Sequence, residues 1–222
     1  MNRIRICALC VIAAFICGCA APVSVEPFDS VVLIDPGHGG FDGGAVASDG
    51  TLEKDINLDV SLHLRDMLFI CGITVEMTRD TDASTQSADA TTIREKKVSD
   101  MHNRLVQYEQ SSLVIAVHQN HFQQSKYSGT QVFYSGNHTE SQHLAEAVQR
   151  AVATDLQPNN NRQIKRATDG VYLMHHTSVP AILVECGFLS NPEELAQLKD
   201  AQYRQKMAWV IQMGYWNYKT ER

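Results

Sequence analysis

Four titratable side chains stand where the sequence changes from apolar to polar. They are His38 in a glycine-rich loop, Glu53 at the start of a helical pattern, and His118 and Glu185 after apolar runs. Two histidines and one carboxylate are a common ligand set for catalytic zinc, which keeps a fourth position for water. Zinc lowers the pKa of that water to about 7, and a further carboxylate can take its proton during attack on a carbonyl. The four residues could therefore form a zinc hydrolase site.

The glycines around His38, in "DPGHGGFDGG" (residues 35–44), have a purpose in such a site. Glycine allows the backbone to turn sharply and leaves space for a metal and a substrate. In an open α/β sheet, reactive groups gather at the carboxyl edge of the strands, so residues far apart in the chain can meet there.

No HExxH motif places two ligands on one helix turn, so the spacing of these residues is weak evidence for a metal site. Each residue also has an explanation that involves structure alone. His118 could cap backbone groups at a strand end, and Glu53 could be an acid favoured by the helix dipole. An unpaired carboxylate at a buried strand end is costly, so Glu185 is harder to dismiss, although it could pair with an arginine such as Arg79. Spacing alone leaves both interpretations open.

Two neighbours of these residues have uncertain roles. Asp35 either orients His38 from outside the ligand set or forms the turn before Pro36. Cys186 is expected on the opposite face from Glu185, as a small core residue. A Cys–His hydrolase that uses Cys186 is an alternative, but the adjacent glutamate disfavours its thiolate.

Strand and helix patterns alternate along the chain, which predicts an α/β sheet covered on both faces. Apolar, β-branched runs predict strands at Val31–Ile34, Ile73–Met77, Leu113–Val117, Gln131–Tyr134, Val171–Met174 and Ala181–Val184. Apolar residues at three- and four-residue spacing predict helices from Glu53 to a stop at Cys71, and at Ile93–Tyr108, Glu140–Leu156 and Pro192–Tyr218. Two polar stretches, residues 80–92 and 157–170, are expected to be loops.

The composition fits one globular domain. The chain has 222 residues, of which 44% are hydrophobic and 20% charged, and its formal net charge is −6. A chain of this length buries one core well. No basic block appears in the body of the chain, so nucleic acid is not expected as a partner.

The first residues have the pattern of an export signal. Arg3 and Arg5 precede an apolar stretch, and small residues follow it. We expect residues 1–19 to be an export signal with a lipobox at Cys19, or else an N-terminal membrane anchor; a buried helix is a weaker alternative. Residues 20–29 would form a short linker and residues 30–222 the catalytic domain. Residues 1–19 hold four of the six cysteines, and the two that remain cannot form a disulfide framework for the domain.

Five motifs in order resemble the zinc-dependent N-acetylmuramoyl-L-alanine amidases. They are "IDPGHGGFDGGA", "LEKDINLDV", "VEMTRDTD", "VIAVHQN" and "VPAILVECGFLSNPEE", and they cover the chain from about Val31 onward. The resemblance implies a single α/β domain with a twisted, mixed sheet of about six strands and helices on both faces. It also implies hydrolysis of the amide between N-acetylmuramic acid and L-alanine in peptidoglycan.

Carried over by position, the resemblance assigns one catalytic zinc ion to His38, Glu53 and His118, and the catalytic role to Glu185. The usual "SIHAN" motif is "AVHQN" here, so Ala116 and Gln119 differ from the commoner residues.

The stretches "VHQNHF", "KYSGTQVFYS" and "VECGFLSN" are most similar to the germination-specific amidases that act on spore cortex and lead to muramic-δ-lactam. We therefore expect an exported, membrane-associated protein, placed between the membranes of the forming spore, with an activating protein partner that the sequence does not identify. The alternatives are a vegetative cell-wall amidase, a zinc peptidase that cuts the stem peptide, and a non-catalytic peptidoglycan-binding lipoprotein.

Overall fold

The computed structural model describes residues 31–221. The predictions for the export signal, the lipobox at Cys19 and the linker lie outside the described residues. Within the described part of the chain, no helix is both long and apolar enough to cross a membrane.

A six-stranded mixed sheet forms the centre of the molecule, in the order β2-β1-β3-β6-β4-β5. The strands are β1 (Val32–Pro36), β2 (Val75–Met77), β3 (Leu113–Asn120), β4 (Gln131–Tyr134), β5 (Lys165–Arg166) and β6 (Ala181–Phe188). Strands β2, β1, β3 and β6 are parallel, and β4 pairs antiparallel with β6. The predicted α/β class and mixed sheet are confirmed.

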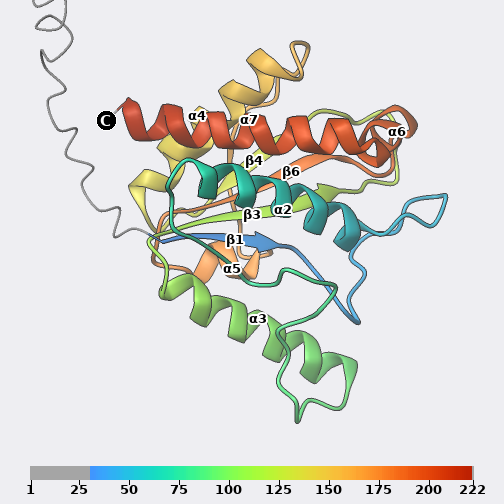
Figure 1. Ribbon diagram of the computed structural model, residues 1–222. Helices are drawn as coiled ribbons and strands as arrows, with labels where there is room; N and C mark the ends of the chain where they lie inside the picture. Colours follow the sequence, from blue (N-terminus) through green and yellow to red (C-terminus); the bar gives the residue numbers. More distant parts are fainter. Residues whose placement is uncertain (1–30, 222) are drawn as a thin grey trace, which may run out of the picture.

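Helices cover both faces of this sheet (Figure 1). They are α2 (Glu53–Ile70), α3 (Ile93–Glu109), α4 (Thr139–Asp155), α5 (Tyr172–His176), α6 (Pro192–Lys199) and α7 (Ala201–Thr220). Helices α2, α4 and α7 lie on one face, while α3 and α5 lie on the other.

The sheet separates two hydrophobic cores because successive strand residues point to opposite faces. In β1, Val32 and Ile34 belong to the larger core, and Leu33 belongs to the smaller one. All three side chains are buried. A strand buried on both sides explains why these runs are continuously apolar in the sequence.

The last predicted helix is two helices in the structure. Its start is as expected: Asn191 accepts hydrogen bonds from the backbone N–H groups of Glu193 and Glu194, and a proline occupies the first turn. The prediction of one helix to Tyr218 is wrong, because Asp200 leaves the helical conformation and caps α7. An aspartate there satisfies two N–H groups and permits the change of direction.

A second correction concerns residues 157–176. The prediction of a strand at Val171–Met174 is wrong: Tyr172–Met174 form the first part of the short helix α5, and Val171 is its N-cap residue. The missing strand is β5, which lies within the stretch expected to be a loop and pairs with β4. Four apolar residues fit a short helix as well as a strand, and β5 is too short and polar to show a period.

Candidate active site

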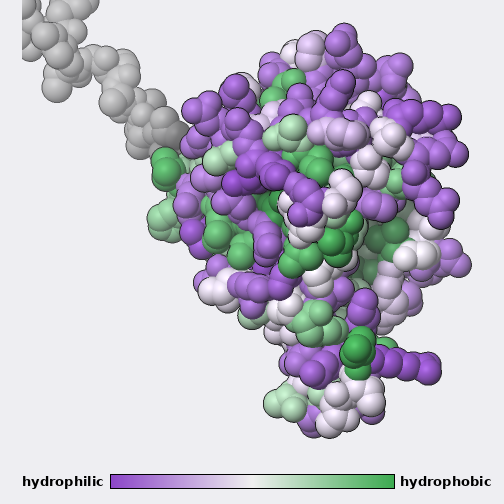
Figure 2. Space-filling model, turned by 90° about the vertical axis from the view of Figure 1, so that its right-hand side faces the viewer, coloured by the Kyte–Doolittle hydropathy of each residue, from purple (hydrophilic) through white to green (hydrophobic). Residues whose placement is uncertain are grey.

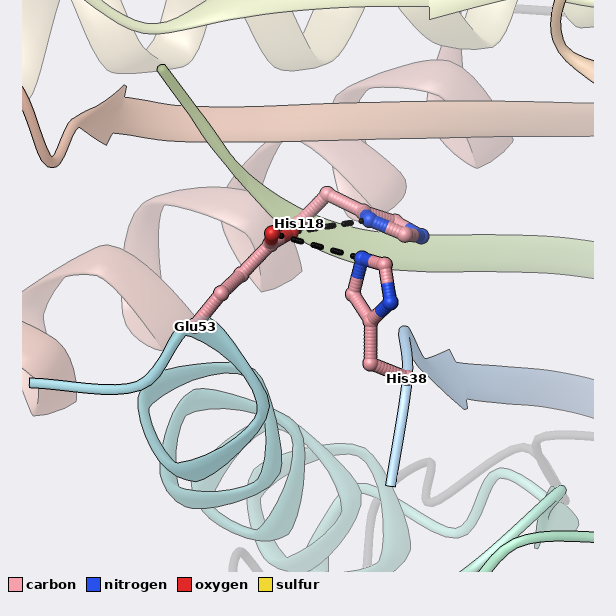
Figure 3. A group of neighbouring side chains, drawn as sticks. All are labelled: His38, Glu53 and His118. Atoms are coloured by element: carbon pink, nitrogen blue, oxygen red, sulfur yellow. Dashed lines mark hydrogen bonds and ion pairs between the residues drawn. The ribbon is translucent and has the colours of Figure 1, made fainter. Parts of the chain in front are cut away.

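The parallel strands bring the predicted residues to one edge of the sheet. Strands β1 and β3 pair up to Pro36 and Val117, so His38 and His118 emerge side by side. His118 pairs directly with Glu185 of β6. Strands β3 and β6 extend further than expected, and both residues therefore lie inside strands instead of after them. Glu53, the first residue of α2, approaches the same edge (Figure 3).

Glu53 lies between the two histidines. Its Oε2 is 3.3 Å from Nε2 of His38, and its Oε1 is 3.1 Å from Nδ1 of His118. One donor atom from each of the three residues lies within 4.8 Å of the others. Figure 3 shows both rings turned toward this carboxylate. The structure thus brings together three residues that could hold a metal ion, and their imidazole and carboxylate donors suit zinc.

The glycine-rich loop makes this approach of side chains feasible. A Cβ atom on Gly37 would lie 2.2 Å from Cε1 of His118, and one on Gly44 would lie 2.6 Å from Oε2 of Glu53. His38 itself has a φ of 62°, a left-handed conformation that costs a non-glycine residue about 1 kcal/mol or more. The position of His38 therefore requires glycines on both sides of it in the loop and a strained backbone at His38 itself.

Two buried arginines hold the backbone of this loop. Arg79 donates to the carbonyl oxygens of Pro36 and Gly37, each at 3.0 Å. Arg104 donates to the carbonyl oxygen of His38 at 2.6 Å. The expected alternative of an Arg79–Glu185 ion pair is wrong, because the Arg79 guanidinium is used by backbone carbonyls.

Asp35 is not the residue that orients His38. It is buried and bonded to the Arg104 guanidinium, to the Thr78 hydroxyl at 2.6 Å and to the Tyr108 hydroxyl at 2.5 Å. Burial acts to raise its pKa, but the charge of Arg104 and the two hydroxyl donors outweigh burial and hold the pKa below its usual value. Asp35 therefore belongs to the network that supports the loop.

The carboxylate that contacts the His38 ring is Asp42, not Asp35. Its Oδ2 is 3.0 Å from Nδ1 of His38, on the side of the ring that faces away from Glu53. Carboxylates commonly hold the second nitrogen of a metal-binding histidine. Asp42 is not among the residues predicted from the sequence, although an acid four positions after a histidine in the same loop is a usable signal.

Without a metal ion, the acids around His38 favour its protonated form. Burial acts to lower the pKa of His38, but hydrogen bonds and charges from Asp42 and Glu53 raise it to about 9. Burial acts to raise the pKa of Glu53, but the two histidines lower it well below its usual value. Metal binding must displace that proton, so the affinity of this cluster for metal rises with pH.

Glu185 has a different environment from the three clustered residues. Its Oε2 is buried and has no hydrogen-bond partner among the described residues. Burial raises its pKa to about 7; His118 and His38 act in the opposite direction, and Glu53 reinforces the rise. A carboxyl group with a pKa near neutrality can both accept and donate a proton.

Cys186 points away from this edge, as expected. It is fully buried in the larger core, and burial raises the pKa of its thiol. A Cys–His hydrolase based on Cys186 is therefore excluded by the position and protonation of the thiol. Neither Cys186 nor Cys71 forms a disulfide within residues 31–221.

A His–Glu–His cluster beside a buried carboxylate, at the carboxyl edge of an α/β sheet, has the side chains that a metal-dependent hydrolase could use. Residues 32–215 match the N-acetylmuramoyl-L-alanine amidase family. The chain belongs to this family, and its activity is hydrolysis of the amide between N-acetylmuramic acid and L-alanine in peptidoglycan.

Relatives of known name support the assignment. The germination-specific N-acetylmuramoyl-L-alanine amidase of Bacillus subtilis is 36% identical over 203 residues, which are 90% of this chain and 84% of that protein. The CwlD amidase from Clostridioides difficile, solved in complex with the GerS lipoprotein, has a TM-score of 0.84 at 35% identity and covers 87% of this chain and 100% of that chain. A second amidase from Clostridium difficile has a TM-score of 0.74 at 25% identity, over 87% and 98% of the two chains.

Proposed function

We propose that the protein is a zinc-dependent amidase of spore cortex peptidoglycan, with His38, Glu53 and His118 as metal ligands and Glu185 as the catalytic residue. The observation that carries the proposal is the convergence of the three donor atoms within 4.8 Å, next to a buried carboxyl oxygen without a partner. Two neutral imidazoles and one carboxylate match a catalytic zinc site, which leaves one position for a reactant.

The roles of the chain's own residues follow from their positions. Zinc held by the three ligands would supply polarisation of the scissile carbonyl and acidification of a water molecule. Glu185 accepts the proton of the attacking water and delivers it to the alanine nitrogen as the amide breaks. Asp42 fixes the ring of His38 so that Nε2 faces the metal position. Arg79 and Arg104 keep the loop from moving during turnover.

The cortex assignment rests on the relatives. The Bacillus subtilis relative is named as germination-specific, and the CwlD amidase is the structural neighbour with the TM-score of 0.84. We infer that this chain prepares cortex peptidoglycan for muramic-δ-lactam formation by removing stem peptides. A vegetative wall substrate is the alternative, since the chain is also 29% identical to the amidase LytC of Bacillus subtilis.

We also infer an exported protein with a protein partner. The pattern of residues 1–19 favours export, with membrane association through a lipid at Cys19 or through an uncleaved anchor. The CwlD structure contains a lipoprotein partner, which makes a partner reasonable for this chain too. Both statements concern the location and regulation of the enzyme and do not alter the chemistry of the site.

The test is hydrolysis of purified peptidoglycan, compared between spore cortex and vegetative sacculi, with and without a chelator. We expect chelator-sensitive release of peptides that carry a free N-terminal L-alanine, and restoration by zinc. Mass spectrometry identifies the new N-terminus and excludes cuts inside the stem peptide. Equal rates on both sacculi would contradict cortex specificity, and chelator-resistant release would contradict the metal.

A further inference from the structure

A hollow of about 430 Å³ lies next to the catalytic edge of the sheet. We call it the aromatic cleft, and its lining includes Asn120, Phe122, Tyr127, Gln131, Arg162 and Lys165. Its residues come from the end of β3, the loop between β3 and β4, strand β4, and the segment that leads into and begins β5. Figure 2 shows this end of the molecule, where apolar side chains are gathered among polar ones.

The aromatic cleft begins where the catalytic residues end. Asn120 lies two positions after His118 on the same strand. Gln131 pairs directly with Glu185 across β4 and β6, so the two side chains lie next to each other on one face. A ligand that extends from Glu185 past Gln131 therefore enters the cleft.

Aromatic rings form one wall of this hollow. Phe122 and Tyr127 are 51% and 38% exposed, and both stack on the buried ring of Phe188 at centroid distances of 5.7 and 6.4 Å. Exposed rings that are fixed from beneath provide an apolar contact surface at low cost in conformational entropy.

Arg162 is positioned as a receptor for an anion. Its Nε donates to the carbonyl oxygen of Ser128 at 2.6 Å, and its Nη1 donates to Oε1 of Gln131 at 3.0 Å. The guanidinium lies 4.7 Å from the centroid of Phe188. Its Nη2 has no hydrogen-bond partner among residues 31–221. A guanidinium held on one side and free on the other is prepared for a carboxylate.

The positive charge of the aromatic cleft is only partly balanced by the protein, through the electrostatic interaction of Arg162 with Glu194, which lies outside the cleft. No aspartate or glutamate lines it, and neither Arg162 nor Lys165 forms an ion pair in the described part of the chain. Some surface cations elsewhere on this chain of net charge −6 pair with acids, as Lys199 does with Asp49. The charge of the aromatic cleft is therefore complementary to an acidic ligand.

We propose that the aromatic cleft binds the stem peptide of the substrate, with Arg162 and Lys165 receiving its carboxylates. This proposal rests on the proposed function, in which Glu185 delivers a proton to the alanine nitrogen. The peptide half of the substrate then leaves from the Glu185 side, toward Gln131 and the cleft. An extended peptide advances about 3.3–3.6 Å per residue, so the residues that follow alanine reach Arg162. The cleft selects stem peptides with free carboxylates over amidated ones.

The test uses the full-length protein with soluble N-acetylmuramoyl peptides whose carboxylates are either free or amidated. Binding of the corresponding free peptides is measured by calorimetry, and KM and kcat are measured separately. The variants are Lys165→Met, Arg162→Gln and their combination, and the control is Lys206→Met, an exposed cation on α7. Unfolding midpoints establish that each variant is folded.

We expect the double variant to raise both the peptide Kd and KM by about tenfold or more, because hydrogen bonds to a charged group are lost. The value of kcat should stay nearly constant. The wild type should bind the peptide with amidated carboxylates as weakly as the double variant binds the peptide with free carboxylates. Lys165→Met alone should show part of this effect, and it decides the question if Arg162→Gln lowers the unfolding midpoint.

Equal binding of free and amidated peptides by the wild type would overturn the proposal, as would an equal effect of Lys206→Met. The outcomes also separate the two hypotheses. Normal cleavage with an unchanged KM in the variants would refute the aromatic cleft and leave the amidase function intact. Charge-dependent peptide binding without any cleavage would support peptide binding in the aromatic cleft and refute the proposed amidase function.

Discussion

Asp35 and Glu185 are both carboxylates on neighbouring regions of one sheet, but their surroundings are opposite. Asp35 is fully buried and receives bonds from Arg104, Thr78 and Tyr108, so its pKa lies below the usual value. Glu185 has a buried oxygen with no hydrogen-bond partner in the part of the chain that the structure describes, and burial raises its pKa to about 7. The first arrangement keeps a charge fixed for structure, and the second keeps a proton exchangeable for chemistry.

Replacement of Glu185 should have the largest effect on activity. We expect Glu185→Gln to lower kcat by about 10²–10⁴-fold, because general acid–base transfer is lost while size is preserved. Zinc content should be unchanged, and the variant should remain folded. Turnover of peptidoglycan and metal analysis check both statements. The control is Glu193→Gln, at an exposed acid in α6, which should keep wild-type turnover. Wild-type turnover in Glu185→Gln would contradict the catalytic role of Glu185.

Removal of the partner of Asp35 should mainly affect stability. We expect Arg104→Met to lower the free energy of unfolding by about 3–5 kcal/mol, because it leaves a buried carboxylate uncompensated. Denaturant titration measures this loss. Arg94→Gln, an exposed arginine on the same helix, serves as the control and should change little. Equal losses in the two variants would mean that the Asp35 network has no special role.

Asp42 is intermediate between the two carboxylates, because it holds a single ring nitrogen. We expect Asp42→Asn to weaken zinc binding by about 10–100-fold, as removal of such a partner commonly does. Competition with a chromogenic chelator measures the affinity. Asp66→Asn, at the far end of α2, should leave it unchanged. An unaltered affinity in Asp42→Asn would show that the loop alone orients His38.

The pH dependence of stability should have opposite signs for the two residues in metal-free protein. Since folding lowers the pKa of Asp35, its network stabilises the fold above about pH 4 and loses this contribution as the pH falls further. Since folding raises the pKa of Glu185 to about 7, its contribution is complete below its unfolded pKa and is lost as the pH rises through 7.

Denaturant titrations of metal-free wild type, Asp35→Asn and Glu185→Gln across this range provide the measurement. The stability advantage of the wild type over Asp35→Asn should shrink in acid. Glu185→Gln should gain on the wild type as the pH rises from about 4.5 toward 7. Parallel curves for the three proteins would show that the two carboxylates do not differ in the way that their surroundings indicate.

The sequence predicted the sheet and the clustered residues because their signals are local. The apolar run of β1 and the periodic pattern of α2 each identify one element, and the glycines identify the loop that carries His38. What it could not predict were contacts between distant segments. The partners of Asp35 come from residues 78, 104 and 108, which belong to other elements.

Two errors of secondary structure have related causes. The run at Val171–Met174 is apolar enough for a strand, but it is too short for its period to distinguish a strand from a helix. The break at Asp200 had a local signal, since aspartate is a good capping residue, but a continuous helical pattern surrounds it. Tertiary packing decides such cases, and the sequence alone shows only that both outcomes are allowed.

The parallel direction of β1, β3 and β6 also determines where the described chain begins. Val32 starts β1 at the end of the sheet opposite to the edge that carries His38, Glu53 and His118 (Figure 1). Five residues at about 3.3 Å each separate the two ends of that strand by about 16 Å. The described chain therefore begins on the side of the molecule away from His38, Glu53 and His118. These three residues and the aromatic cleft lie at the opposite end of the sheet, so access to them from solvent does not have to pass the start of β1.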